Sequence, residues 1–129
     1  MPGLSALGSL LETMSAAGLP TVIRTGGTER ALPAAVDLAA YRIVQESLTN
    51  IARHAAATTA SVRIDHRPGA LVIRIDDDGV ATPGVEPVPG VGLLGMRERI
   101  TALGGRLRAA PRREGGFSVH AELPVDRMP

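Results

Sequence analysis

Hydrophobic residues recur at helical spacing in three parts of the chain. In residues 4–17, apolar side chains fall every three or four positions, which predicts a helix that Gly18 and Pro20 bring to an end. A longer helix is predicted over residues 33–56, because this stretch begins with a proline, is rich in alanine and has no internal glycine. A third helix is predicted over residues 92–103.

The segments between these helices predict strands. Helix and strand alternate at first, and antiparallel strands end the chain, which indicates an α+β fold: a two-layer sandwich in which a mixed, mostly antiparallel sheet carries helices on one face. Residues 80–89 contain three prolines and a glycine and are predicted to be a loop. The predicted strands cover residues 21–25, 60–66, 70–77, 106–110 and 117–123.

The strand that precedes Gly79 carries the clearest chemical signal. Side chains of a strand alternate between its two faces, so Leu71, Ile73, Ile75 and Asp77 share one face. If the three apolar residues point into the core, Asp77 points inward as well. A buried carboxylate needs a partner, because an unpaired buried charge is costly. We therefore expect Asp77 to bind a ligand that donates a hydrogen bond, although Asp-Gly pairs are also common in ordinary turns.

The long helix carries a polar stripe. Each residue of a helix turns by about 100°, so Glu46, Asn50 and Arg53 fall within a sector roughly 60° wide, with His54 at its border. The amide oxygen of Asn50 suits Mg²⁺, Arg53 suits phosphate, and Glu46 can accept a proton. An ordinary solvated helix face would contain the same residue types. The opposite face is expected to pack in the core and comprises Ala40, Val44, Ser47, Leu48, Ile51 and Ala55.

A glycine-rich segment leads into the third helix. Residues 90–95 (GVGLLG) match the spacing of the dinucleotide-binding fingerprint, but Pro87-Val88-Pro89 stands where that fingerprint requires a strand. What remains is a set of glycines before a helix N-terminus, where free backbone N–H groups and the helix dipole favour a phosphate. An ordinary loop followed by a helix start would look the same.

Composition narrows the classes of function. The 129 residues suffice for one domain with a real core, and a net charge of +1 with scattered basic residues gives no footprint for nucleic acid or a membrane surface. All 14 basic residues are arginine, which we interpret as a bias of genome composition. The chain has no cysteine, so neither disulfides nor a thiolate zinc site are possible. The apolar stretch 4–11 is too short and too interrupted to be a signal peptide or a membrane span.

In their order and spacing, these features resemble a known family. Residues 41–55 (YRIVQESLTNIARHA) resemble the N box of the ATP-binding domain of bacterial sensor histidine kinases, in the branch of the nitrate sensors and the lipid-desaturase thermosensor. Asp77-Asp78-Gly79 resembles the first glycine box of that family, and residues 90–99 resemble the second. Leu103-Gly104-Gly105 and Gly115-Gly116-Phe117 continue the same pattern.

The resemblance implies the Bergerat fold, which gyrase, the Hsp90 chaperones and the MutL proteins share. It implies one catalytic and ATP-binding domain over residues 1–129, with a core of about 19–125. The dimerising hairpin with the phosphoacceptor histidine is not recognisable, because His54 belongs to the N box and His66 and His120 fall in predicted strands. We therefore expect a monomer that binds ATP and does not phosphorylate itself.

The same resemblance implies a role for each site residue. Asp77 would accept the adenine amino group, and Gly79 would let the backbone approach the base. Asn50 would hold Mg²⁺ against the phosphates of ATP, with Arg53 and His54 near the phosphate oxygens. Val80 to Gly92 would form the lid. The residues implied to contact ATP within and after the lid are Val80, Gly90, Val91, Gly92, Leu93 and Leu94.

Glu46 resembles the catalytic position that polarises the acceptor histidine on a partner domain. The implied partners are therefore ATP, the phosphoacceptor and dimerisation domain of the parent kinase and, indirectly, a response regulator. No contact with nucleic acid or with a membrane is expected from this segment, and the cytoplasm is the expected location.

Two departures from the family pattern bear on these expectations. Ala81 stands where the first glycine box usually has a second glycine, which implies a stiffer lid hinge. Phe117 or Ser118 occupies the place of a threonine that lies near the adenine in related ATPases, so this contact is left unassigned. Two alternatives remain open: an ATP-binding interaction module of the anti-sigma-factor kind, and a degenerate scaffold that binds no nucleotide.

Overall fold

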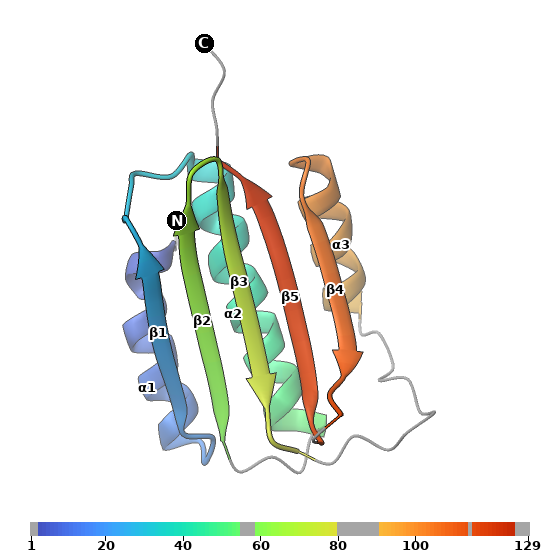
Figure 1. The fold of residues 1–129 in the computed structure, drawn as a ribbon. Coiled ribbons are helices and arrows are strands. Elements are labelled where there is room, and N and C mark those ends of the chain that lie inside the picture. The colour runs from blue at the N-terminus through green and yellow to red at the C-terminus, as the bar shows by residue number, and fades with distance from the viewer. Residues whose placement is uncertain (1–2, 55–58, 80–90, 114, 126–129) are drawn as a thin grey trace.

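The computed structural model of the protein describes residues 3–54, 59–79, 91–113 and 115–125, without the side chains of His54 and residues 91–93. Within these ranges, the predicted helices and strands are all present (Figure 1). In chain order they are a 3₁₀ turn η1 (Leu4–Ala6), α1 (Leu7–Ala16), β1 (Thr21–Gly27), α2 (Ala34–His54), β2 (Ala60–Arg67), β3 (Ala70–Asp77), α3 (Val91–Ala102), β4 (Arg106–Pro111) and β5 (Phe117–Pro124).

Most bounds differ from the predicted ones by one or two residues, and two of the differences affect how the chain packs. The first turn of the N-terminal helix is 3₁₀ rather than α, and its first N–H, that of Leu4, donates to Oδ1 of Asp37 on α2 at 2.9 Å. β1 continues two residues beyond Thr25 to Gly27, which has a φ of 79°. A side chain at Gly27 would overlap the carbonyl of His66, so glycine lets β1 stay paired with β2 to its end.

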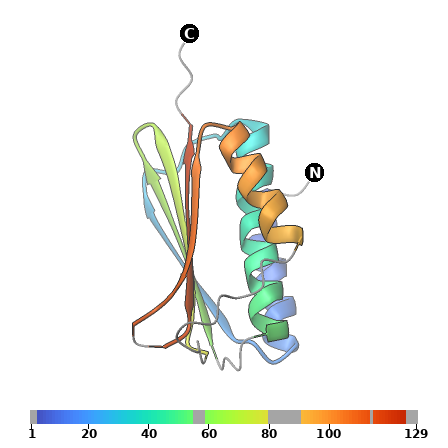
Figure 2. The ribbon, with the colours of Figure 1, turned by 90° about the vertical axis from the view of Figure 1, so that its right-hand side faces the viewer.

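The sheet has the order β1-β2-β3-β5-β4. β1 runs parallel to β2, and the other neighbours are antiparallel, so the sheet is mixed and mostly antiparallel as predicted. All three helices lie on one face of the sheet, and the other face has no helix among the described residues (Figures 1 and 2). The predicted two-layer α+β class is confirmed.

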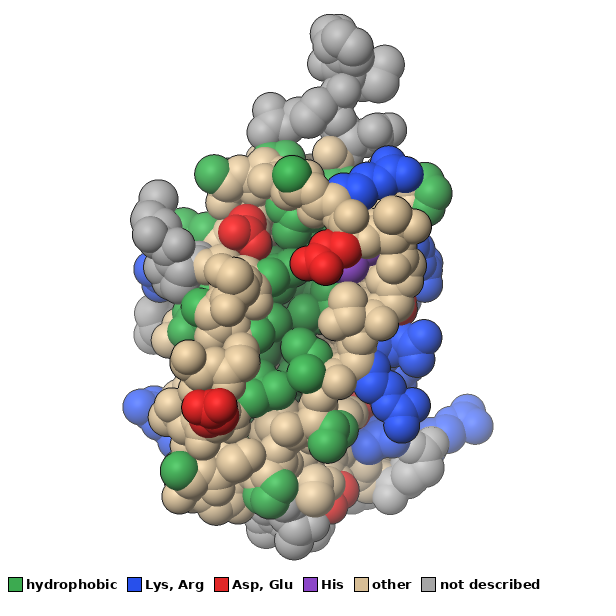
Figure 3. Space-filling model, turned by 90° about the vertical axis from the view of Figure 1, so that its left-hand side faces the viewer, with side chains coloured by type: hydrophobic (Ala, Val, Ile, Leu, Met, Phe, Trp, Pro, Cys, Tyr) green, Lys and Arg blue, Asp and Glu red, His purple; other side chains and the backbone are tan. Residues whose placement is uncertain are grey.

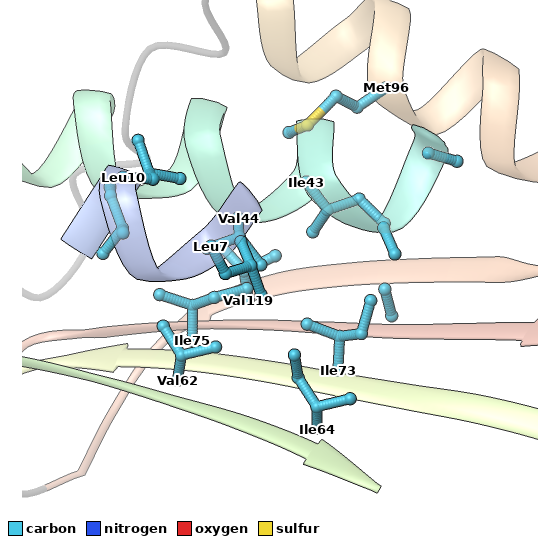
Figure 4. Packing of buried hydrophobic residues seen from close by; sticks show 14 of the residues in the cluster. Leu7, Leu10, Ile43, Val44, Val62, Ile64, Ile73, Ile75, Met96 and Val119 are labelled. Carbon is cyan, nitrogen blue, oxygen red and sulfur yellow. The ribbon is translucent and has the colours of Figure 1, made fainter. Parts of the chain in front are cut away.

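Strand register places the core between the sheet and α2. Ile73 of β3 pairs with Ile64 of β2, and Ile75 pairs with Val62, so the inward side chains of the two strands stack side by side beneath the helices (Figure 4). From the helical layer, α2 contributes Ile43, Val44 and Leu48 to this core, and α1 contributes Leu7, Leu10 and Leu11. With only one tyrosine and one phenylalanine in the chain, this core is aliphatic.

The core is least covered at the β1 edge. Ile23 pairs with Val62 and therefore faces the helices, yet 40% of its surface is exposed. Seen from this side, hydrophobic side chains lie in a hollow of the surface (Figure 3). The interior strands β3 and β5 are better buried, and the end of β3 carries Asp77 of the candidate site.

Candidate nucleotide-binding site

Asp77 ends β3 and points to the helix side of the sheet. Only 3% of its surface is exposed, like that of its inward neighbours on the strand, so the prediction from strand alternation is confirmed. Its Oδ1 accepts a hydrogen bond of 2.7 Å from the N–H of Gly79, which folds the chain back at the strand end. This bond leaves carboxylate lone pairs available for a further donor.

The surroundings of Asp77 shift the pKa of its carboxyl in opposite directions. Burial raises the pKa of the carboxyl above its ordinary value, and the charge of Asp78 adds to that rise. Hydrogen bonds from the backbone amides of Gly79 and Phe117 and the positive charge of Arg112 lower the pKa again. A buried carboxylate with a raised pKa is a common mark of a functional site.

The turn between β4 and β5 packs against Asp77, and the sequence did not predict this contact. Gly116 has a φ of 85°, and a side chain there would overlap the carbonyl oxygen of Asp77. From the same turn, Nη1 of Arg112 donates to that carbonyl oxygen at 3.0 Å. The Gly115-Gly116 pair did signal a turn, but nothing local showed that the turn closes over the end of β3.

The polar stripe predicted on α2 runs toward the C-terminal end of this helix. On the predicted core face of α2, Ala40, Val44, Ser47, Leu48 and Ile51 are buried as expected, and Ala55 lies outside the described residues. Glu46 and Asn50 are half-buried, and Arg53 is exposed. The C-terminal part of α2 and the end of β3 lie at the same end of the molecule in both ribbon views (Figures 1 and 2).

Glu46 lines a pocket between α2 and α3. The pocket has a volume of about 220 Å³, and Arg42 and Arg99 also line it, one from each helix. Met96 and Ile43 form part of its floor and belong to the hydrophobic core. The carboxylate of Glu46 therefore shares an accessible groove with two arginines, where a group of a second molecule can reach it.

The glycine-rich segment before the third helix is only partly described. α3 begins at Val91, one residue before the predicted start, and the side chain of Leu94 is 56% exposed. Gly92 and Leu93 lie in the first turn of α3. Val80 and Gly90, predicted to contact a nucleotide, lie outside the described residues. The side chain of His54 does so too.

The described residues offer few ligands for a metal ion. Among the described residues, no group of three or more His, Cys, Asp or Glu side chains could hold one. Asn50, half-buried on the polar stripe, is a single hard oxygen donor. This arrangement fits Mg²⁺ that arrives on a nucleotide, because Mg²⁺ takes few protein ligands and keeps phosphate and water oxygens.

Comparison with known proteins assigns the class. The profile of a family described as "Histidine kinase-, DNA gyrase B-, and HSP90-like ATPase" matches residues 35–127. The chain therefore belongs to this family of ATPase domains, and the resemblance proposed from the N box and glycine boxes is confirmed. The finer assignment to the nitrate-sensor and thermosensor branch stays a prediction.

Curated relatives are sensor histidine kinases. The chain is 37% identical over 127 residues to sensor histidine kinase YxjM of Bacillus subtilis, which covers 97% of the chain and 31% of the relative. It is 35% identical over 109 residues to sensor histidine kinase LnrJ of the same organism, covering 84% and 27%. It is 37% identical over 99 residues to sensor histidine kinase NarS of Mycobacterium tuberculosis, an alignment that covers 71% of the chain and 23% of the relative. The chain thus spans less than a third of each of these relatives.

Solved structures confirm the fold. The histidine kinase domain of the blue-light activated histidine kinase EL346 from Erythrobacter litoralis superposes with a TM-score of 0.73 at 20% identity, covering 94% of this chain and 60% of that one. A longer chain of the same kinase gives a TM-score of 0.74 at 22% identity, covering 97% and 46%. In the described part of the chain, no helix is both long and apolar enough to cross a membrane.

Proposed function

We propose that the chain is the ATP-binding catalytic module of a sensor histidine kinase. It binds Mg·ATP and donates the γ-phosphoryl group to a histidine on a separate phosphoacceptor domain. One observation carries the proposal: in a member of this ATPase family, the buried carboxylate of Asp77 lies at the same end of the molecule as the half-buried amide of Asn50. An adenine donor and a phosphate-bound cation are the two ends of one ligand.

At the adenine end, Asp77 accepts a hydrogen bond from the exocyclic amino group. Its fixed orientation supports this role, because the bond from Gly79 holds the carboxylate before a ligand arrives. Gly79 is buried two residues further along the chain, and because it has no side chain, its backbone can approach the base. A single oriented acceptor of this kind distinguishes adenine from guanine, which has a carbonyl oxygen in place of the amino group.

At the phosphate end, Asn50 holds the Mg²⁺ that ATP carries. The bound ion would neutralise phosphate charge during transfer. Arg53 and His54 follow Asn50 along α2 and bind phosphate oxygens. The backbone amides of the first turn of α3, from Val91 to Leu94, add hydrogen bonds to the phosphates.

Glu46 acts on the second substrate. An imidazole nitrogen of the acceptor histidine forms a bond to the γ-phosphorus, while the bond to the oxygen that bridges to the β-phosphate breaks and ADP leaves. Glu46, half-buried in its groove, accepts a hydrogen bond from the other ring nitrogen and so increases the nucleophilicity of the attacking one. The phosphorylated domain would then serve a response regulator. We place this activity in the cytoplasm, with the isolated module as a monomer.

The adenine contact is tested by titrating the chain with a nonhydrolysable ATP analogue and Mg²⁺ in a calorimeter. Asp77→Asn should weaken binding by about 10- to 150-fold, which corresponds to losing one charge-assisted hydrogen bond of about 1.5–3 kcal/mol. Asp76→Asn is the matched control, because Asp76 is the adjacent carboxylate on the opposite face of β3. Equal binding by both variants would contradict the proposed site, and no binding by the unsubstituted chain would favour the degenerate scaffold.

The catalytic role is tested by phosphotransfer in trans. The chain is mixed with the separately produced phosphoacceptor domain of a related sensor kinase, and label is followed from γ-labelled ATP. Glu46→Gln should slow transfer by about 10²- to 10⁴-fold with ATP affinity unchanged, because general-base assistance is lost. Glu98→Gln, an exposed carboxylate on α3, is the control. ATP binding without transfer to any acceptor would favour the anti-sigma-like interaction module.

A further inference from the structure

The hydrogen-bond ladder between β3 and β5 stops one residue before Asp77. The last pair of the ladder is Asp76 with Ser118. The carbonyl of Asp77 therefore lies beyond the pairing of β3 with β5, while on the other side Asp77 still pairs with Ala60 of β2, and the N–H of Asp78 donates to the carbonyl of Thr59 at 3.3 Å. A side chain takes over at this point: the guanidinium of Arg112 donates to the Asp77 carbonyl oxygen at 3.0 Å.

Arg112 itself is held firmly in the turn that it starts. Its N–H donates to the carbonyl of Gly116 at 2.9 Å, and its own carbonyl accepts the N–H of Gly115 at 3.2 Å. The side chain is partly buried, and Gly116 brings the turn into direct contact with the Asp77 backbone. The turn is thus a brace that spans from β4, past β5, to the end of β3.

We propose that Arg112 is a positioning residue for nucleotide recognition, which fixes the backbone of Asp77 so that the carboxylate stays aimed at the adenine site. This inference rests on the function proposed above. Because its guanidinium donates to the Asp77 carbonyl oxygen, Arg112 acts through the Asp77 main chain and through its charge. It belongs to the β4–β5 turn, a part of the chain to which the family resemblance gave no site residue.

The charge of Arg112 provides a specific readout. Two charged side chains act on the Asp77 carboxyl in the described structure: Asp78 raises its pKa and Arg112 lowers it. Removing the positive charge should therefore raise the Asp77 pKa further. Because the ionised form accepts the adenine hydrogen bond, loss of ATP affinity on acidification should then begin at a higher pH. A purely structural brace would leave this midpoint unchanged.

The test measures ATP affinity against pH for Arg112→Gln, Arg112→Lys and the control Arg113→Gln, which removes the adjacent exposed arginine. Arg112→Gln should weaken binding by about 2- to 10-fold at neutral pH and move the affinity midpoint upward. Arg112→Lys should keep the midpoint near its original place, because the charge remains. Arg113→Gln should match the unsubstituted chain. An Arg112→Gln profile that overlays the Arg113→Gln profile overturns the inference.

A double-mutant cycle separates this inference from the proposed function. In the Asp77→Asn background, Arg112→Gln should have no further effect on affinity or on its pH profile, because the carboxylate that it positions is gone. If Asp77→Asn weakens ATP binding but Arg112→Gln does not, Arg112 has no positioning role and the proposed site stands. If Asp77→Asn binds ATP normally, the adenine site itself is wrong.

A measurement without nucleotide covers the case in which Arg112→Gln perturbs the turn. The pKa of the Asp77 carboxyl is followed by NMR titration of its side-chain carbon in the unsubstituted chain and in Arg112→Lys and Arg112→Gln. An upward shift in Arg112→Gln alone supports the inference, and equal values in all three chains overturn it.

Discussion

The two faces of the sheet treat carboxylates in opposite ways. On the outer face, Asp65 and Asp76 pair with Arg63 and Arg74 of their own strands at 3.1 and 3.0 Å, and both arginines are more than half exposed. On the inner face, Asp77 is buried and held by backbone amides. Charge on the outer face is solvated and interchangeable, whereas the single inward carboxylate of the strand is placed where a ligand can use it. The comparison predicts which substitutions the protein tolerates.

The largest contrast should come from truncating one residue on each face of β3. Ile73→Ala should lower the free energy of unfolding by about 2–5 kcal/mol, because Ile73 is fully buried and the change leaves a cavity. Its neighbour on the outer face is the matched control, and Arg74→Ala should cost less than about 1 kcal/mol. Urea unfolding followed by circular dichroism measures both. Equal costs would mean that the two faces are not distinguished as described.

A smaller but specific loss is expected where the β4–β5 turn meets Asp77. Gly116→Ala should destabilise the fold by about 1–3 kcal/mol, since its φ of 85° disfavours any side chain and the new Cβ would overlap the Asp77 carbonyl. Gly95→Ala is the control of opposite sign. Gly95 lies within α3 with open space around it, so alanine should stabilise by up to about 1 kcal/mol. Thermal melts of both variants test the pair, and a stabilising Gly116→Ala would contradict the described contact.

The buried carboxylate should oppose stability at neutral pH. The pKa of Asp77 is raised in the folded chain, so folding binds its proton more tightly, and Asp77 costs the fold most when it is ionised. The cost is fully present above the folded pKa and disappears as the pH falls towards the unfolded value. Asp77→Asn should therefore melt higher than the unsubstituted chain at neutral pH, with a difference that shrinks on acidification. Asp76→Asn should show no such gain, and a gain that grew on acidification would refute the assignment.

The outer ion pairs should matter least. A double-mutant cycle on Arg74 and Asp76 should give a coupling of about 0.2–1 kcal/mol that declines with added salt, because the Arg74 side chain is 52% exposed. Chemical unfolding at two salt concentrations measures it. A coupling well above this range, or one insensitive to salt, would show that the outer face is not simply solvated.

Local periodicity accounts for what the sequence predicted of this fold. Strand alternation alone placed Asp77 inward, and helical rotation alone separated the buried side of α2, with Val44 and Leu48, from Glu46 and Asn50. These are relations between residues a few positions apart, so a single sequence contains them. The order of the strands in the sheet came from the structure, not from the pattern.

The missed contacts are those that depend on the tertiary fold. Arg112 and Asp77 are 35 residues apart, and their hydrogen bond exists only because β5 lies between β3 and β4. Likewise, the N–H of Thr59 donates to Asp78 from the adjacent strand end at 2.9 Å. Neither arginine nor threonine carries a local mark of such a role. The exposure of Ile23 was also unpredictable, because it reflects where the helical layer ends rather than the strand itself.

Helix α2 connects the N-terminal segment of the chain with the polar residues of the candidate site. In its first turn, α2 receives the N-terminal segment through the bond from Leu4 to Asp37, and near its last turn it carries Asn50 and Arg53. A helix of 21 residues is about 31 Å long and behaves as a stiff rod. A displacement of its first turn is therefore transmitted along the whole helix to Asn50 and Arg53, the residues proposed to bind Mg²⁺ and phosphate. A segment or partner that contacts the first turn of α2 would thereby change the position of these two residues.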